Sequence, residues 1–246
     1  MTVDPRFRLL TARGTAAAIV LGALAVIATG WAGLVLLFAF FLPSSLVSRV
    51  SRPPEAGLDS KGEQRDALQV LANGLAPSLG AALAGWFGPE GLAWLVLTGG
   101  LAVAAADTWA TAIGSWSRRP PRQLLTGRIV PRGANGGVTL LGTIGAGAGA
   151  LVVGLVALLK PAAQPALAAI IIGMAGMFLD AALGGALQGQ FYCERCGQPS
   201  EWPRHRCGTR TVKVGGIRWL TNDAVNAMAT LAGSVAGAAW WLLSSR

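Results

Sequence analysis

The sequence predicts an all-α polytopic membrane protein with about seven transmembrane helices, built as a single integral membrane domain over residues 1–246. Three features of the 246 residues support this: 53% are hydrophobic, only 13% are charged and 34 are glycine. Soluble domains carry roughly 25% charged residues and about 7% glycine, so most of this chain cannot face water. Excess glycine suits helices that pack closely in lipid. A soluble enzyme is therefore excluded.

Seven apolar stretches are long enough to cross roughly 30 Å of hydrocarbon as helices. They run over about 15–30, 31–48, 66–87, 90–115, 134–159, 165–190 and 221–245. The first two are short and meet at Gly30 without a polar loop, so one interrupted segment, and a total of six helices, is the alternative. The basic N-terminal stretch leads to no clear signal-peptide cleavage site, so we interpret the first segment as a retained helix.

Basic residues are distributed unevenly between the two sides of such a protein. With seven spans, the N-terminus and the connections 49–65, 116–133 and 191–220 share one side, and 18 of the 20 Lys and Arg residues lie there. Loops rich in Lys and Arg stay in the cytoplasm, so we expect a cytoplasmic N-terminus and an active site facing the cytoplasm. If the source is a bacterium, the membrane would be its inner or plasma membrane. The net charge of +9 favours phosphates and membrane lipid headgroups as partners. The long apolar runs and single Tyr do not fit a nucleic-acid-binding protein.

Small residues at four-residue spacing predict the packing faces of two helices, because they let helix backbones approach closely. On the third segment they are Ala72, Ala76, Gly80 and Ala84, and on the fifth Gly142, Ala146, Ala150 and Gly154.

Acidic residues fall into two groups once the spans are drawn. Asp107 and Asp180 lie inside predicted helices, whereas Asp66 and Asp223 lie at predicted cytoplasmic helix ends. A carboxylate in lipid costs several kcal/mol unless it is paired or bound to a metal, so a buried Asp indicates function. Both internal residues lie roughly ten residues, or about 15 Å, from the inner end of their helix, a depth that suits an inward-opening cavity. The alternative is that each Asp only neutralises an Arg.

Uncharged polar residues accompany these carboxylates. Asp66, Gln69 and Asn73 form one stripe on the third helix, with Lys61 and Arg65 just before it. Asn222 and Asn226 share a face of the seventh helix beside Asp223, and Asp180 shares a face with Gln188. For Thr221 we expect only a helix-capping role.

The connection between the fourth and fifth segments is rich in arginine and glycine. One Arg guanidinium group can bind two phosphate oxygens at once. A glycine-rich helix start with free N–H groups also favours binding of an anion. We therefore expect a phosphate-binding segment, with Arg118 and Arg119 equally well explained as topology signals. Its candidate residues are Arg122, Arg128, Arg132, Gly133, Asn135, Gly136 and Gly137.

Carboxylates, amides and basic side chains together are what magnesium-dependent phosphoryl transfer requires. We expect Asp107, Asp180 and Asp223 to bind Mg²⁺, with Asn73, Asn222 and Asn226 as polar support. Lys61, Arg65 and the loop arginines would hold phosphates. No Walker A pattern occurs, so the nucleotide site is not a P-loop.

A cytoplasmic loop over 191–220 contains four candidate metal ligands. Cys193 and Cys196 form C-x2-C, and His205 and Cys207 follow as H-x-C. Cysteine sulfur and histidine nitrogen suit zinc. We expect a structural Zn²⁺ here; free thiols and a catalytic metal are the alternatives, in that order.

Five strings follow one another along the chain: KGEQRDALQVLANG from Lys61, DTWATAIGS from Asp107, PRQLLTGRIVPRGANGGVT from Pro121, D-x-x-L-G-G-A-L-Q from Asp180 and ND-x-VN from Asn222. In this order they resemble the membrane family once catalogued as domain of unknown function 92, which includes plant phytyl-phosphate kinase and animal transmembrane protein 19. The resemblance runs over roughly residues 15–245. The D-x-x-A at Asp107 is also similar to a motif of polyprenol kinases and CTP-using cytidylyltransferases.

The resemblance implies transfer of a phosphoryl group from a nucleoside triphosphate, CTP by analogy, to an isoprenyl monophosphate of phytyl or polyprenyl type, forming the diphosphate. The acceptor tail would lie among the helices. Two rivals remain: a CTP-dependent lipid cytidylyltransferase, and a transporter or flippase of phosphorylated lipids. A transporter needs a polar path to both faces. The outer halves of the predicted helices carry almost no charge, which disfavours it.

Overall fold

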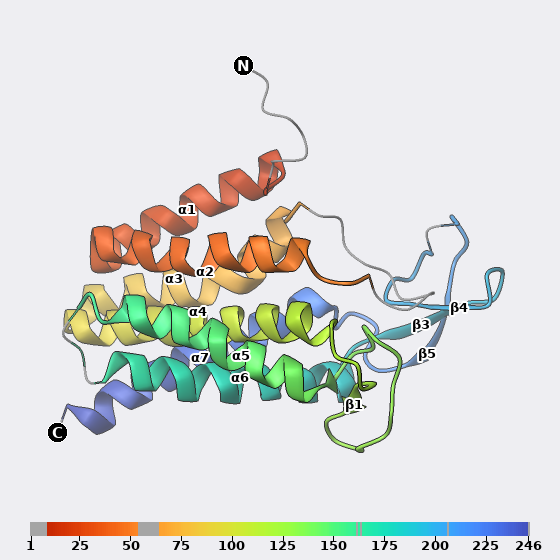
Figure 1. Cartoon of the computed structure of the whole chain (residues 1–246). Coiled ribbons are helices and arrows are strands. Elements are labelled where there is room, and N and C mark those ends of the chain that lie inside the picture. The colour runs from red at the N-terminus through yellow and green to blue at the C-terminus, as the bar shows by residue number, and fades with distance from the viewer. Residues whose placement is uncertain (1–8, 54–63, 161, 163, 206, 246) are drawn as a thin grey trace.

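A computed structural model of the chain describes residues 9–53, 64–160, 162, 164–205 and 207–245. Within this part, seven helices are long and apolar enough to cross a membrane, as predicted. They form one bundle with short strands at one end (Figure 1). The helices are α1 (Ala12–Thr29), α2 (Trp31–Arg49), α3 (Ala67–Phe87), α4 (Glu90–Gly114), α5 (Leu140–Ala157), α6 (Pro165–Leu187) and α7 (Asn222–Ser244). The strands are β1 (Arg122–Gln123), β2 (Gly137–Val138), β3 (Gln190–Cys193), β4 (Gln198–Ser200) and β5 (Val212–Gly215).

Gly30 separates the first two apolar segments into two helices. Its φ of 66° is a left-handed conformation that ends α1 and lets the chain turn back along α2 (Figure 1). The six-helix alternative is therefore wrong.

Side chains cap several helix starts. Asp66 and Gln69 form a reciprocal capping box at α3, in which each side chain accepts a hydrogen bond from the other residue's backbone N–H. The Thr221 hydroxyl accepts from Ala224 N at 3.3 Å, so its predicted capping role is confirmed.

The fifth helix begins later than the sequence predicts. The expected start near residue 134 is wrong: α5 begins at Leu140, and the Thr139 hydroxyl accepts from Gly142 N at 2.9 Å. Gly133 and Gly136 have φ values of 87° and 73°, which a right-handed helix excludes. The glycine run therefore forms a loop before the helix.

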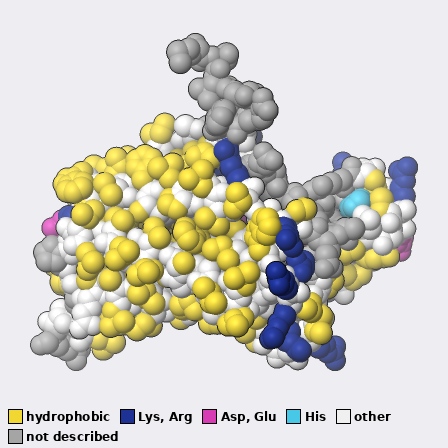
Figure 2. Space-filling view, viewed as in Figure 1, with side chains coloured by type: hydrophobic (Ala, Val, Ile, Leu, Met, Phe, Trp, Pro, Cys, Tyr) yellow, Lys and Arg dark blue, Asp and Glu magenta, His cyan; other side chains and the backbone are white. Residues whose placement is uncertain are grey.

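The central helix of the bundle is α4, which packs against α1, α2, α3, α5, α6 and α7. It is buried continuously from Ala93 to Ala106. Glycine permits its close approach to α7, because a Cβ at Gly99 would collide with the backbone at Gly233. The other helices surround α4 and present apolar side chains on the flank of the bundle (Figure 2).

The two predicted packing stripes have different outcomes. All four residues on α5 are buried, which confirms that face. On α3 only Ala72 of its stripe is fully buried, although Gly80 lies close to Val96 of α4 and Ala84 packs against the core. The other fully buried residues of α3 are Asn73, Gly74, Pro77, Ser78 and Ala81. Polar groups such as the Ser78 hydroxyl are excluded from lipid, so they decide which face turns inward.

The end of the bundle that carries the strands is also the basic end. Lys and Arg side chains gather there, whereas hydrophobic side chains cover the flank (Figure 2). At the opposite end, Lys160 forms an ion pair with Glu90. This distribution agrees with the predicted grouping of the loops, and the cytoplasmic assignment of the basic end stays a prediction.

Candidate functional site

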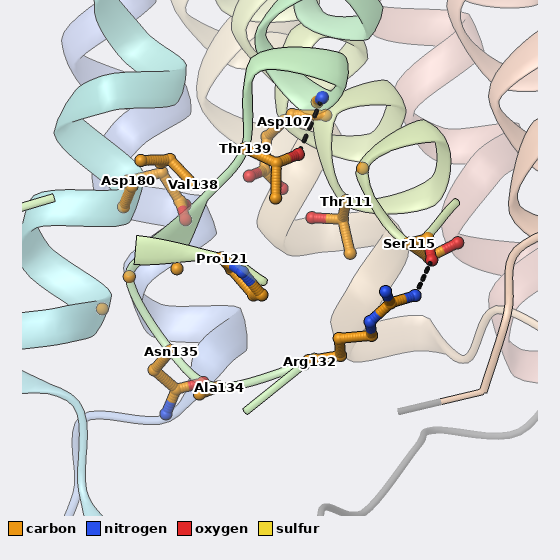
Figure 3. Close-up of a pocket in the computed structure, with 18 of the residues that line it drawn as sticks. Asp107, Thr111, Ser115, Pro121, Arg132, Ala134, Asn135, Val138, Thr139 and Asp180 are labelled. Carbon is orange, nitrogen blue, oxygen red and sulfur yellow. Dashed lines mark hydrogen bonds between the residues drawn. The ribbon is translucent and has the colours of Figure 1, made fainter. Parts of the chain in front are cut away.

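A cavity of about 390 Å³ lies at the basic end of the bundle. Asp107 of α4 and Asp180 of α6 project toward it, and the loop between α4 and α5 forms its outer wall (Figure 3). Its size falls within the roughly 300–1,000 Å³ of small-molecule sites. The cavity therefore joins the two membrane-embedded carboxylates to the predicted phosphate-binding segment.

Asp107 and Asp180 lie at matching depths. Each precedes the last residue of its helix by seven positions, since α4 ends at Gly114 and α6 at Leu187. Seven residues correspond to about 10 Å, so the sequence-based depth of about 15 Å was too large.

One carboxylate oxygen in this cavity has no partner. Asp180 Oδ2 is buried and makes no hydrogen bond within the described residues. Burying a polar oxygen without a partner is costly, and a carboxylate most of all. A cation between the two Asp residues would satisfy it.

The loop over 121–139 is docked on α6 by close backbone contact. Gln123 Nε2 donates to Gly185 O at 3.1 Å, and strands β1 and β2 pair Arg122 with Val138. At Gly136 a Cβ would lie 2.6 Å from both Ala181 O and Gly185 Cα. Only glycine fits this contact, which holds the loop beside Asp180.

Backbone N–H groups give this loop anion-binding character. Within the described residues, the N–H groups of Gly133, Asn135 and Gly136 donate no hydrogen bond, and all three residues line the cavity with Gly137. The N-terminus of α5 at Thr139 lines it too. Free N–H groups and the positive end of a helix dipole both favour a phosphate.

The three predicted loop arginines are placed differently. Arg132 lines the cavity, and its guanidinium donates to Ser115 O at 3.1 Å (Figure 3). Arg128 is exposed and does not line the cavity. Arg122 is also exposed and donates to Gly127 O at 2.9 Å, within its own loop. Of the three, only Arg132 lines the cavity that the carboxylates also line.

The remaining predicted residues divide between the cavity and its surroundings. Asn222 lines the cavity, whereas Asp223 and Asn226 do not, so this geometry gives Asp223 no support as a metal ligand. Asp66 serves as the α3 cap. Lys61 lies outside the described residues.

Several cavity residues carried no clear signal in the sequence. Thr111 lies one turn after Asp107 on α4, but single hydroxyl residues in apolar helices are too common to indicate a site. Arg52 and Glu201 come from separate connections whose folding cannot be foreseen. The sequence placed Gln69 and Gln188 on polar helix faces without selecting them as ligands. The other polar lining residues that it did not select are Ser51, Arg52, Thr111, Ser115, Thr139, Thr143 and Glu201.

A second cavity of about 610 Å³ is an apolar groove between α1, α2 and α3. Along α1 it extends from Thr15 to Ile27, which is about 18 Å of helix. Arg65 and Asn73 are its polar lining residues near the start of α3. We call this cavity the tail groove.

Arg65 connects the tail groove with the site cavity. Its guanidinium lies 5.5 and 5.8 Å from the ring centres of Phe40 and Phe41, which also line the groove. Burial lowers the pKa of Arg65 to about 10, and the negative charge of Asp107 opposes this lowering. Arg65 is therefore cationic at neutral pH and interacts electrostatically with a carboxylate of the site cavity.

The four candidate zinc ligands lie together on the segment between α6 and α7. The donor atoms of Cys193, Cys196, His205 and Cys207 all lie within 4.8 Å of one another. None of these residues lines the site cavity.

Comparisons with known proteins agree with this architecture. The chain is 28% identical over 233 residues to an uncharacterized membrane protein of Methanocaldococcus jannaschii, covering 94% of this chain and 85% of the relative. It is 30% identical over 225 residues to Protein PGR of Arabidopsis thaliana, and the match covers 80% of this chain and 77% of Protein PGR. It is 29% identical over 237 residues to an uncharacterized membrane protein of Synechocystis, and the match covers 92% of this chain and 81% of that relative. No solved structure matches. Residues 2–234 match the model of the integral membrane protein family DUF92, and the chain belongs to that family.

Proposed function

We propose that this protein is a magnesium-dependent kinase that transfers a phosphoryl group from a nucleoside triphosphate, CTP by the family resemblance, to an isoprenyl monophosphate. The observation that carries the proposal is the convergence of Asp107 and Asp180 on one cavity with Arg132 and the glycine loop. The family resemblance supplies the isoprenoid and the CTP. The predicted cytoplasmic position of the basic end would give the site access to soluble nucleotide.

The carboxylates suit a hard cation. Asp107 and Asp180 would hold Mg²⁺, and the unpartnered Asp180 Oδ2 supports a cation at this position. When bound, Mg²⁺ would offset the negative charge that the two substrates bring together. Asp223 is left out of this set because it does not line the cavity.

The reaction needs no dedicated base. An oxygen of the acceptor monophosphate is already ionised at neutral pH, so it can attack the γ-phosphorus directly. The new P–O bond forms as the bond from the γ-phosphorus to the β,γ-bridging oxygen breaks, and nucleoside diphosphate leaves. Arg132 and the N–H groups of Gly133, Asn135 and Gly136 would bind phosphate oxygens and stabilise the transferring group. The lack of a histidine in the cavity lining fits this chemistry.

The tail groove would hold the acceptor. Its length of about 18 Å and its apolar walls suit a linear prenyl chain lying along α1. Arg65 at its polar end would bind the acceptor phosphate, so the tail would stay among the helices while the phosphate points toward the site cavity.

Purified protein tests this proposal directly. The protein is incubated with Mg²⁺, CTP, ATP, GTP or UTP, and phytyl or geranylgeranyl monophosphate, and the products are resolved by mass. A kinase forms the prenyl diphosphate and nucleoside diphosphate. Release of pyrophosphate with a cytidylyl lipid would instead identify a cytidylyltransferase, and no product with any pair would reject the kinase.

The two arginines that flank Pro131 should differ in effect. Arg132→Ala is expected to lower kcat/KM by roughly 10- to 100-fold, since a charged hydrogen bond contributes about 1.5–3 kcal/mol. Arg128→Ala, which removes an exposed guanidinium from the same loop, should change kcat/KM less than twofold. Steady-state rates with varied nucleotide measure both. Equal small effects would mean that the loop serves only as a topology signal.

Tail-length selectivity should depend on the middle of the tail groove. Gly22 lines the groove, and a Cβ there would meet only Leu34 Cδ1, at 3.5 Å. Gly22→Phe should fill the groove about 10 Å beyond Thr15. Each buried methylene contributes about 0.8 kcal/mol, so kcat/KM for geranylgeranyl monophosphate should fall at least roughly tenfold, and that for geranyl monophosphate should change little.

Gly147→Phe is the matched control for this substitution. Gly147 is a helical glycine on α5 whose Cβ would meet only Met174 Sδ, at 3.9 Å, and it does not line the groove. Its variant should keep the selectivity of the wild type. An unchanged ratio of geranyl to geranylgeranyl use in Gly22→Phe would place the tail elsewhere.

A further inference from the structure

The segment between α6 and α7 contains a built metal-ligand cluster that the phosphoryl-transfer site does not use. Strands β4, β3 and β5 form a small antiparallel sheet in that order, and Cys193 ends β3. The donor atoms of Cys193, Cys196, His205 and Cys207 lie within 4.8 Å of one another. Cys193 and Cys196 lie at the start and within the turn between β3 and β4. His205 and Cys207 lie in the chain between β4 and β5.

Two tight turns aim these donors at one point. In the first, Gly197 has φ 64° and its N–H donates to Cys193 O at 2.8 Å. In the second, Gly208 has φ 84° and its N–H donates to His205 O at 2.9 Å. Each turn thus closes around a ligand pair and ends in a glycine whose backbone conformation other residues rarely adopt. The repeated geometry indicates a shared centre between the two turns.

The donor atoms are close enough to share one ion, and the separation of Cys193 and Cys207 matches tetrahedral coordination. Cys193 Sγ lies 3.7 Å from Cys207 Sγ, and His205 Nδ1 lies 3.2 Å from Cys207 Sγ. Sulfur ligands at about 2.3 Å from a common zinc ion lie about 3.8 Å apart at the corners of a tetrahedron. A disulfide would bring the sulfurs to about 2.05 Å, and all three cysteines are free.

We propose that Cys193, Cys196, His205 and Cys207 bind one structural Zn²⁺ ion. Three thiolates and one imidazole complete a tetrahedron and leave no open position for a substrate, which distinguishes this site from a catalytic zinc centre. The short strands offer few apolar side chains to bury, and sheets of this size need a metal or a disulfide to hold their shape.

The zinc site also bears on the phosphoryl-transfer cavity through Glu201. This residue directly follows β4 and lines the cavity. The sheet is attached to the bundle beside α6, where Ile217 N donates to Leu187 O at 2.8 Å and Gly189 N donates to Leu220 O at 2.9 Å. Zinc would thus hold the segment 194–211 in place, with Glu201 at the cavity, while the reaction itself proceeds at Asp107 and Asp180.

Metal analysis of the full-length protein tests the proposal independently of activity. Protein purified without chelators and without a histidine tag should contain about one zinc ion per chain, and its thiols should resist alkylation until a strong chelator is added. Loss of a ligand in Cys196→Ser should weaken zinc binding by at least roughly 100-fold. Glu194→Gln, an exposed change within the same turn, should keep the full zinc content.

Trypsin provides a second readout of the structural role. Arg195, Arg204 and Arg210 lie on the segment that the ion would hold, so chelator-treated protein should be cleaved there while the helices stay intact. Zinc-free protein with three readily alkylated thiols would overturn the proposal, and so would unchanged zinc content in Cys196→Ser. If that variant does not accumulate, the wild-type protein is alkylated before and after chelation. Thiols that react equally in both cases would overturn the proposal, and thiols that react only after chelation would support it.

Discussion

Asp107→Asn is expected to lower the rate of phosphoryl transfer by roughly 100-fold or more, the scale of effects seen when a catalytic metal or charge is misplaced. The substitution removes a charge with little change in volume, so the bundle should insert and fold as before. Asp180→Asn should have a comparable effect, because both side chains line the same cavity. Single-turnover rates with saturating nucleotide and Mg²⁺ measure the loss.

Asp223→Asn separates the structure-based assignment from the sequence-based one. The sequence grouped Asp223 with the other two as a ligand, but Asp223 does not line the cavity. The rate of phosphoryl transfer should therefore fall less than tenfold in Asp223→Asn. A loss as large as that of Asp107→Asn would restore Asp223 to the metal site.

A metal-specific rescue distinguishes a ligand from a structural carboxylate. Asp107→Cys offers a softer ligand, so Mn²⁺ should recover more activity than Mg²⁺ relative to the wild type. Full activity of Asp107→Asn in Mg²⁺ would remove Asp107 from the metal site, whatever the rescue shows.

The helices of this protein could be predicted because a membrane leaves few choices. A segment that crosses lipid must be apolar and helical over its whole length, so span number and order follow from the apolar runs. The convergence of Asp107 and Asp180 could be anticipated for a similar reason. Carboxylates at equal depth on separate helices avoid lipid by facing a shared interior.

Which face of each helix turns toward the interior of the bundle could not be predicted so well. Lipid tails and protein interiors are equally apolar, so hydrophobic periodicity does not mark the buried face of a membrane helix. On α3 the four-residue alanine and glycine stripe lies only at the edge of the buried face, whose centre carries Asn73, Pro77 and Ser78. The tail groove depends on how α1 packs beside α3 and was therefore not foreseen.

Loop structure was the other part that the sequence did not reveal. The run around Gly136 reads equally well as a helix start or as a turn, and only the positive φ values decide for the turn. Its contact with Ala181 and Gly185 joins residues about 50 positions apart, which no local pattern encodes. The different positions of Arg128 and Arg132 relative to the cavity follow from that docking.

Gly136→Ala should disable the site by lifting the loop from α6. A non-glycine residue at φ 73° costs about 1–2 kcal/mol. The added Cβ would also lie 2.6 Å from Ala181 O and from Gly185 Cα, and overpacking of this kind costs about 1–3 kcal/mol. Because both neighbours are backbone atoms of α6, the loop has to move and carries Arg132 and the N–H groups away from Asp180. We expect kcat/KM for nucleotide to fall at least roughly 100-fold.

Gly127→Ala separates backbone strain from loss of docking. Gly127 lies in the same loop with φ 67°, and a Cβ there would meet nothing within 4 Å. Its variant should therefore show a similar strain-related loss of thermal stability but nearly normal kinetics. Hydrogen exchange across 121–139 should increase in Gly136→Ala alone, because only that variant loses the contact with α6. Equal kinetics in the two variants would mean that seating of this loop on α6 does not position the groups that bind phosphate.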